Sequence, residues 1–260
     1  MSFLSQASGL FTYYFNAVNE HSLHTPFLYE LYTKVVKSDH LNGDFSEIKS
    51  IYKKLLKDKS KVHITELGAG SSVNSSTSRS VRSIAQHSLT SLKFSALYYR
   101  LIKYFNIRHI IELGTSLGIN TLYLAKYEAT KIYTFEGCQN TINIAKTNFE
   151  KAEATNIKII EGNINQTFPS FLNGQLKPDM VYIDANHHYT PTLRYFDLIL
   201  KNRHDNTIVI IDDIHWSEEM SKAWKEICDH PEVSLSIDLN RCGILFFKHD
   251  LTKQHFYLMF

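Results

Sequence analysis

The stretch IIELGTSLGINTLYLAKY, residues 110–127, decides the fold. An apolar run leads into a turn that contains Gly114 and Gly118, and a sequence of helical character follows. A turn that holds an adenosyl cofactor needs a strand to support it, glycines where a side chain would collide with the ligand, and a helix that starts at once. The amides at the start of such a helix face the ligand. The stretch therefore predicts a cofactor-binding turn.

A second glycine-bearing turn, TELGAG at residues 65–70, lacks two of these features. It runs into the polar sequence SSVNSSTSRS before any helix, and no strand that ends in an acid follows it. Glu136, by contrast, ends the next β-rich run after Gly114, where a carboxylate can accept both hydroxyl protons of a ribose. We therefore expect the cofactor at the later turn, and we interpret TELGAG as a loop of the N-terminal region.

From residue 107 onward, short β-rich runs alternate with longer helical stretches, which is the pattern of a parallel sheet covered by helices. After a last helix at about 217–229, the runs VSLSIDL and CGILFFK are expected to form a closing hairpin. The prediction is an α/β, Rossmann-like, doubly wound and mostly parallel sheet of seven strands within a domain of residues 107–260. The other strands are expected at 108–113, 131–136, 157–161, 179–184 and 207–212.

Residues 1–106 are predicted to form a helical region that serves as a lid, binds substrate or mediates dimerisation. Apolar residues at i, i+3 and i+4 spacing indicate helices with one buried face. These helices are expected over 3–19, 25–37, 44–57 and 80–105. The sequence does not decide among the three roles, and a homodimer stays an open alternative.

The composition excludes several classes of protein. The 28 Lys and Arg residues nearly balance the 26 Asp and Glu residues, so no general attraction to nucleic acid or to an acidic membrane is expected. The three cysteines are scattered and form no C-x-x-C pair, which argues against a disulfide framework or a zinc knuckle. No uncharged apolar run is long enough to span a membrane. We expect a cytoplasmic protein.

The turn reads E-x-G-x-x-x-G from Glu112 to Gly118, which resembles motif I of class I S-adenosylmethionine-dependent methyltransferases. The resemblance covers roughly residues 107–248, and it implies that Glu112 lies close to the methionine ammonium and that Glu136 binds the ribose. Asn163 matches a position that often contacts adenine in this family, although an Asn after Gly is equally a common turn residue. The cofactor-binding residues implied are Glu112, Gly114, Thr115, Ser116, Gly118, Glu136, Gly137, Asn163 and Asp184.

Acids also follow two later predicted strands. VYIDANHHY at 181–189 contains Asp184, and IVIIDDIHW at 208–216 contains Asp212 and Asp213. Ligands of open α/β sheets bind at the carboxyl ends of the strands, so the three carboxylates are expected to converge. Close carboxylates repel one another unless a cation or protons intervene, and hard divalent ions take oxygen ligands. We predict that these three acids bind Mg²⁺ or another divalent cation; helix capping is the alternative.

This arrangement resembles metal-dependent small-molecule O-methyltransferases of the catechol, caffeoyl-coenzyme A and macrolide-sugar types. The metal that the resemblance implies would bind two neighbouring substrate oxygens and lower the pKa of the hydroxyl. His187, His188 and His215 are the candidate bases. His187 stands where catechol-type enzymes have a lysine, and a neutral imidazole with a pKa near 6.5 suits proton abstraction. The predicted catalytic residues are His187, Asp184 and His215.

We therefore predict an S-adenosylmethionine-dependent O-methyltransferase that acts on a hydroxyl of a small molecule or glycan with the help of a divalent metal. One alternative is a metal-independent methyltransferase that modifies protein or nucleic acid. The sequence lacks an Asn/Asp-Pro-Pro-Tyr signature after the fourth strand and lacks a net basic field, which argues against it. A second alternative is a non-catalytic protein that binds the cofactor to stabilise a complex. The acids and histidines at the strand ends argue against that alternative.

Overall fold

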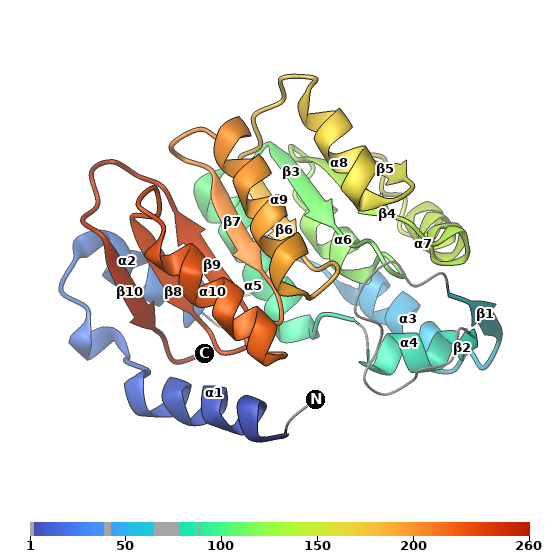
Figure 1. Cartoon of the computed structure of the whole chain (residues 1–260). Helices are drawn as coiled ribbons and strands as arrows, with labels where there is room; N and C mark the ends of the chain where they lie inside the picture. The colour runs from blue at the N-terminus through green and yellow to red at the C-terminus, as the bar shows by residue number, and fades with distance from the viewer. Residues whose placement is uncertain (1–2, 39–42, 65–77, 88) are drawn as a thin grey trace. The chain divides into compact units, whose positions relative to one another are not determined.

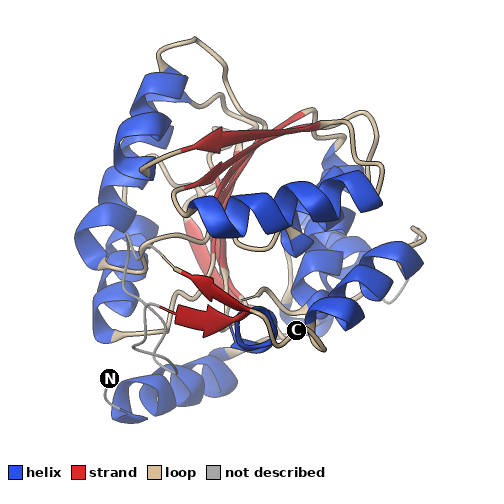
Figure 2. Cartoon of the chain, turned by 90° about the vertical axis from the view of Figure 1, so that its right-hand side faces the viewer, coloured by secondary structure: helices blue, strands red, loops and turns tan. Residues whose placement is uncertain are grey.

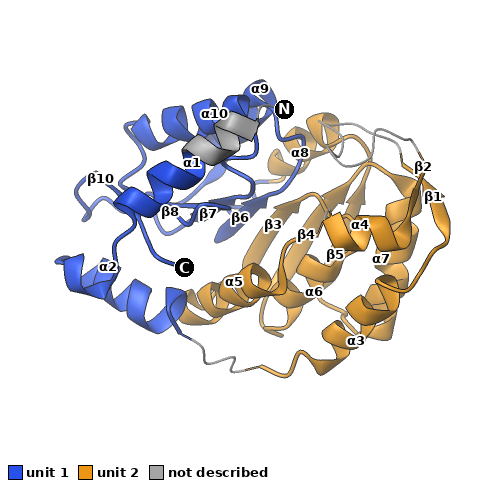
Figure 3. Cartoon of the chain, turned by 90° about the horizontal axis from the view of Figure 1, so that it is seen from below, with its two compact units in different colours: residues 1–39, 175–260 blue, residues 40–174 orange. Residues whose placement is uncertain are grey.

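The computed structural model describes residues 3–38, 43–64, 78–87 and 89–260 (Figure 1). The TELGAG turn and most of the serine-rich run after it lie outside the described residues. The chain forms two compact units, one made of Met1–Asp39 with Gln175–Phe260 and the other of His40–Gly174 (Figure 3). Within the described ranges, no helix combines the length and the apolar character that a membrane crossing requires.

The unit His40–Gly174 contains three strands of the central sheet in the order β3-β4-β5, and all three are parallel. A separate antiparallel pair, β1 (Lys61–His63) and β2 (Ser78–Ser80), was not expected from the sequence. The central strands are β3 (His109–Leu113), β4 (Lys131–Glu136) and β5 (Ile157–Glu161). The helices of this unit are α3 (Ser46–Leu55), α4 (Val81–His87), α5 (Leu92–Phe105), α6 (Ile119–Ala125), α7 (Gln139–Lys151) and α8 (Ile164–Leu172).

The other unit contains five strands of the central sheet in the order β10-β8-β9-β7-β6. β6 and β7 are parallel, β9 is antiparallel to both of its neighbours, and β10 is parallel to β8. These strands are β6 (Met180–Ile183), β7 (Ile208–Ile211), β8 (Leu235–Asp238), β9 (Gly243–Phe246) and β10 (Gln254–Tyr257). The helices are α1 (Phe3–Asn16), η1 (Glu20–Ser22), α2 (Pro26–Leu31), the π-helix η2 (Tyr32–Val36), α9 (Tyr189–Asn202) and α10 (Glu218–Asp229) (Figure 2).

The predicted α/β fold is confirmed, as are the five predicted parallel strands and the closing hairpin of β8 and β9. The predicted strand number of seven is wrong, because β10 adds an eighth strand at the edge beside β8. The single helix predicted over 80–105 is also wrong. It is divided into α4 and α5, and Ser91 before α5 has an extended backbone with ψ 145°.

The predicted N-terminal helices do not form a core of their own. Residues of α3 and α4 pack with residues of α6 and α7 in one apolar cluster of the unit His40–Gly174. This cluster includes Phe45, Ile48, Ile51, Leu55, Val81, Ile84, Leu117, Ile119, Leu122, Ala145 and Phe149. The predicted domain boundary between residues 106 and 107 stays a prediction, whereas the compact units divide the chain elsewhere.

The first helices pack against the last strands of the chain. The buried Tyr13 of α1 donates a hydrogen bond from its hydroxyl to the carbonyl oxygen of Leu258 at 2.7 Å. Val18 forms an isolated parallel bridge with the same residue, and the Phe27 ring meets the Phe246 ring edge to face at 5.4 Å. Residues 3–36 therefore belong structurally with β8, β9 and β10 rather than with the rest of the predicted N-terminal region.

Gly118 at the start of α6 has a φ of +79°, and a Cβ atom there would lie 2.5 Å from Cε1 of Phe149. Gly118→Ala should therefore lower the free energy of unfolding by about 2–4 kcal/mol, since backbone strain and overpacking each cost about 1–3 kcal/mol. Urea unfolding measures the loss. The double variant Gly118→Ala/Phe149→Ala should lose less than the sum of the two single variants, and simple additivity would contradict this contact.

Candidate functional site

The carboxylate of Glu112 lies at the centre of the predicted cofactor turn. Its side chain is fully buried, and it accepts hydrogen bonds from Asn120 Nδ2 at 3.0 Å, Thr121 Oγ1 at 2.6 Å and Thr134 Oγ1 at 2.7 Å. Thr134 faces Glu112 across the β3–β4 register. Thr134 uses its one hydroxyl proton on Glu112, so Thr115 donates to Thr134 at 2.6 Å. This network fixes the start of α6 against β3 and β4.

The loop between β3 and α6 follows a path that L-residues rarely adopt. Gly114, Ser116 and Gly118 have φ values of +106°, +50° and +79°. The amides of Gly114 and of the buried Thr115 both donate to the carbonyl oxygen of Phe135, at 3.0 and 3.1 Å. The sequence predicts that Gly118 leaves room for a ligand. In the structure Gly118 leaves room for the side chain of Phe149, which belongs to the same unit.

Glu136 at the end of β4 binds backbone amides of two loops. Its Oε2 accepts from the amide of Ser116 at 2.9 Å, and its Oε1 accepts from the amides of Gly137 and Cys138, both at 2.9 Å. Through these bonds the carboxylate orders both loops. The structure thus brings Glu136 to the glycine turn, as predicted; its contact with a ribose stays a prediction.

Asn163 caps α8. Its side-chain oxygen accepts from the amide of Asn165 at 2.9 Å, and Gly162 before it has a φ of +121°. This geometry is that of the turn residue, one of the two roles that the sequence left open. A contact with adenine stays a prediction.

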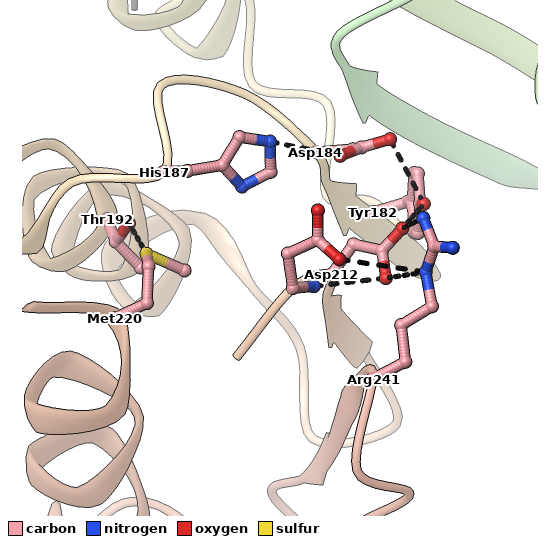
Figure 4. A network of polar contacts seen from close by, with 8 residues as sticks. Tyr182, Asp184, His187, Thr192, Asp212, Met220 and Arg241 are labelled. Atoms are coloured by element: carbon pink, nitrogen blue, oxygen red, sulfur yellow. Dashed lines mark hydrogen bonds and ion pairs between the residues drawn. The ribbon is translucent and has the colours of Figure 1, made fainter. Parts of the chain in front are cut away.

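In the other unit, the two neighbouring acids after β7 have different surroundings (Figure 4). Asp212 is fully buried and accepts from Arg241 through Nε at 3.1 Å and through Nη2 at 3.3 Å, and from the Tyr182 hydroxyl at 2.6 Å. Asp213 is partly exposed and has a φ of +53°, and its amide donates to Asp212 Oδ1 at 3.0 Å. Asp212 therefore anchors the loop that presents Asp213.

Asp184, His187 and Asp213 form a group that could hold a metal ion, because one ligand atom of each lies within 4.8 Å of the other two. His187 Nε2 lies 3.3 Å from Asp184 Oδ1, and Figure 4 shows the imidazole ring directed at this carboxylate. The group differs from the predicted ligand set in one member. His187 takes the place of Asp212, whose carboxylate is bound by Arg241 and Tyr182.

The pKa values of this group depend on one another. Burial opposes the charged form of His187, but the hydrogen bond to Asp184 and the charges of Asp184 and Asp213 outweigh it and raise its pKa to about 9. Burial, followed by the charge of Asp212, raises the pKa of Asp213 to about 7. This raised pKa differs from the value near 6.5 that the prediction of a neutral His187 base assumed; the catalytic role of His187 stays a prediction.

The other two candidate histidines have different partners. His215 Nε2 lies 2.8 Å from Oδ2 of the fully buried Asp238, and its Nδ1 lies 3.4 Å from the Ser221 hydroxyl. His188 Nδ1 lies 3.0 Å from the exposed Glu219. Neither histidine belongs to the group of Asp184, His187 and Asp213, so the catalytic role predicted for His215 stays a prediction without support from this group.

Sequence reasoning missed Arg241 and Tyr182. A buried acid needs a cation or strong donors, so the Asp-Asp pair could have prompted a search for a partner. However, Arg241 is 29 residues from Asp212 and is one of 28 basic residues without a distinctive spacing. Tyr182 is an inward-facing aromatic residue of a buried strand, which ordinarily indicates core packing.

Comparison with known proteins agrees with this fold. Residues 111–214 match a family model described as a methyltransferase domain. The Podospora anserina methyltransferase PaMTH1, solved with SAH, is 14% identical with a TM-score of 0.62 over 87% of this chain and 98% of that one. An O-methyltransferase from Bacillus cereus in complex with SAH is 18% identical with a TM-score of 0.56, over 82% and 96% of the two chains. The O-methyltransferase TomG from Streptomyces achromogenes, in complex with SAM, is 18% identical with a TM-score of 0.52, over 62% and 82%.

At these identities the solved structures establish the fold alone, and the family match covers residues 111–214. The fold is that of methyltransferases solved with SAM or SAH, and in this chain a glycine turn follows β3 and acids follow β6 and β7.

The raised pKa of His187 leads to a prediction about pH. Its pKa rises from 6.5 to about 9 on folding, so the stability that the charged ring contributes is complete below pH 6.5 and is lost as the pH rises through 9. With a chelator present, the difference in free energy of unfolding between the wild type and His187→Asn should shrink between pH 6.5 and 9. An NMR titration of His187 that gives a pKa of 6.5 or below would contradict this.

Proposed function

We propose that the protein is an O-methyltransferase that methylates a hydroxyl of a small molecule or glycan with the help of a divalent cation. The observation that carries this proposal is the group of Asp184, His187 and Asp213, which follows β6 and β7 in a methyltransferase fold. The tomaymycin-synthesis O-methyltransferase TomG, which has a similar fold, supports a small-molecule acceptor. The near balance of charges supports it as well, since a nucleic-acid substrate favours a basic protein.

In this proposal the glycine turn and Glu136 bind S-adenosylmethionine. The cofactor would supply a methyl group bound to its sulfonium sulfur. The acceptor oxygen would form the new C–O bond in line as the C–S bond breaks and SAH leaves. Glu136 accepts from the ribose hydroxyls, and its existing bonds to the amides of Ser116 and Gly137 hold the carboxylate in place beforehand. Glu112 accepts hydrogen bonds from Asn120 and Thr121 and so positions the turn. Its contribution to cofactor binding is therefore indirect, because it fixes the conformation of the loop that contacts the cofactor.

The donor set of the acidic group fits a divalent cation. Two carboxylates and one imidazole lie within 4.8 Å of one another, and burial together with the charge of Asp212 raises the pKa of Asp213, so its negative charge is disfavoured in the absence of a cation. A bound cation would stabilise that charge and lower the pKa of a coordinated hydroxyl. Carboxylate ligands suit Mg²⁺ and Mn²⁺, whereas an imidazole ligand suits Fe²⁺ or Zn²⁺ better. We therefore extend the predicted Mg²⁺ site to these ions.

We assign His187 to this cation site as a ligand rather than as the general base. A base must be neutral before it accepts a proton, whereas the acids around His187 raise its pKa to about 9. As a ligand, Nε2 of His187, which faces Asp184, would release its proton to solvent and bind the cation through the freed lone pair. Arg241 keeps Asp212 out of the ligand set and holds the loop that presents Asp213.

Replacement of Glu136 tests the cofactor part. Glu136→Ala should weaken binding of S-adenosylmethionine by about 1–3 kcal/mol, about 5- to 150-fold in Kd, because hydrogen bonds to a charged group are lost. Isothermal titration measures Kd. Glu161→Gln is the matched control, since Glu161 ends the neighbouring strand β5 and pairs with Lys146; its Kd should equal that of the wild type. An unchanged Kd in Glu136→Ala would refute the assignment.

Binding of Mn²⁺, followed by electron paramagnetic resonance, tests the cation part without any acceptor. Asp184→Asn, Asp213→Asn and His187→Asn should each weaken Mn²⁺ binding at least about tenfold, because each removes a ligand. Asp179→Asn is the control, since Asp179 is an acid of the same unit that pairs with His204. Retention of Mn²⁺ by His187→Asn would return His187 to the role of base, and retention by Asp213→Asn would refute the site. Loss of SAH formation on vicinal hydroxyl compounds after chelation would link the cation to turnover.

A further inference from the structure

A cavity of about 620 Å³ lies beside α10 and β10, within the unit formed by the chain's first and last residues. Its walls come from the loop after β7, from one face of α10 and from the edge strand β10. The residues that define its chemistry are His215, Ser221, Trp224, Lys225, His255 and Tyr257. The group of Asp184, His187 and Asp213 does not line it. We propose that this cavity is a second ligand site, which binds a planar aromatic carboxylate.

One wall of the cavity is aromatic and is fixed in place. The Trp224 and His255 rings lie 6.2 Å apart, and the His255 and Tyr257 rings meet edge to face at 4.8 Å. The indole Nε1 of Trp224 donates to Asp238 Oδ2 at 3.1 Å. A Cβ atom on Gly243 of β9 would lie 2.2 Å from Trp224 Cη2, so the glycine makes room for the indole. Such a preformed aromatic wall favours a flat ring.

A polar end is built next to this wall. The carboxylate of Asp238 is fully buried and accepts from His215 Nε2 at 2.8 Å and from the amide of Asn240 at 2.7 Å, besides Trp224. Asp238 thus fixes the orientation of the His215 ring and leaves Nδ1 facing the Ser221 hydroxyl at 3.4 Å. The serine hydroxyl can donate to or accept from a ligand, which suits an oxygen-bearing ring substituent.

The charges at the cavity favour an anion. Lys225 and Lys253 contribute two positive charges and Asp229 one negative charge. The ammonium of Lys253 is held at the end of α10 by the carbonyl oxygens of Asp229 at 2.5 Å and His230 at 3.1 Å. Burial raises the pKa of the Cys228 thiol in the wall to about 12, so this wall residue is uncharged. The carboxylate of Asp238 is already bound by His215, Trp224 and the amide of Asn240, so a carboxylate on the ligand would pair with the lysine ammonium groups.

The probe is 4-hydroxybenzoate, tested on the full chain. The protein has two tryptophans, so fluorescence of the Trp216→Phe variant reports on Trp224, and isothermal titration of the wild type gives an independent Kd. We expect saturable binding, at least tenfold weaker binding of cyclohexanecarboxylate and phenol, and no binding of benzylamine. Absence of binding at 4-hydroxybenzoate concentrations up to about 10 mM, or equal binding of phenol or benzylamine, would overturn the proposal; this concentration corresponds to about 2.7 kcal/mol of binding.

Variants locate the site. Lys225→Gln/Lys253→Gln should weaken binding of 4-hydroxybenzoate at least tenfold. Lys222→Gln is the matched control, because Lys222 lies on the same helix over the Tyr189 ring and does not line the cavity; its Kd should not change. Thermal melting checks that each variant is folded, and Ser221→Ala gives a second, milder loss of affinity. Unchanged affinity in both the lysine variant and Ser221→Ala, or loss of binding in Asp213→Asn, would place the ligand elsewhere and overturn the proposal.

Discussion

The buried carboxylate of Glu112 makes the contacts on which the unit His40–Gly174 depends. A charge without solvent contact is tolerated only where donors surround it, and here the donors come from α6 and β4. Asn120 is itself oriented by Ser95 of α5, whose hydroxyl donates to Asn120 Oδ1 at 2.9 Å. One carboxylate therefore ties four elements together. This network holds the loop in which Gly114, Ser116 and Gly118 have positive φ values. Without such support the loop would relax to a less strained backbone conformation.

The same physical rule separates Asp212 from Asp213. Two adjacent acids cannot both be buried without compensation. Arg241 and Tyr182 donate hydrogen bonds to Asp212, whereas Asp213 has only a longer ion pair with Arg241 Nε, at 3.7 Å. Burial raises the pKa of both acids, and only Asp213 lies in the group with His187. The pair thus contains one residue that stabilises the loop and one that faces Asp184 and His187. A cation at Asp213 would supply what Arg241 supplies at Asp212.

The sequence predicted what depends on local pattern and missed what depends on distant partners. The apolar runs and strand-end acids located β3 to β9, because buried parallel strands are continuous apolar segments. β10 is short and polar at its start, and its pairing with β8 is visible only in three dimensions. Asp212 and Asp213 were indistinguishable because the deciding residue, Arg241, is far along the chain. His187 was preferred to His188 only through the resemblance to catechol-type enzymes; in the structure the turn directs His187 toward Asp184 and His188 toward Glu219.

Backbone strain and unfavourable charge coincide at the group of Asp184, His187 and Asp213. Asn186, His187 and Asp213 have φ values of +65°, +37° and +53°, in a region that costs non-glycine residues about 1–3 kcal/mol each. The same short loops bring acids together and raise the pKa of Asp213. Neither the positive φ values nor the crowding of Asp213 by other acids stabilises the fold. Strained residues and crowded acids at one place indicate a requirement other than folding. For this reason the group of Asp184, His187 and Asp213 carries the functional proposal. The contacts of Glu112, by contrast, are satisfied within the fold.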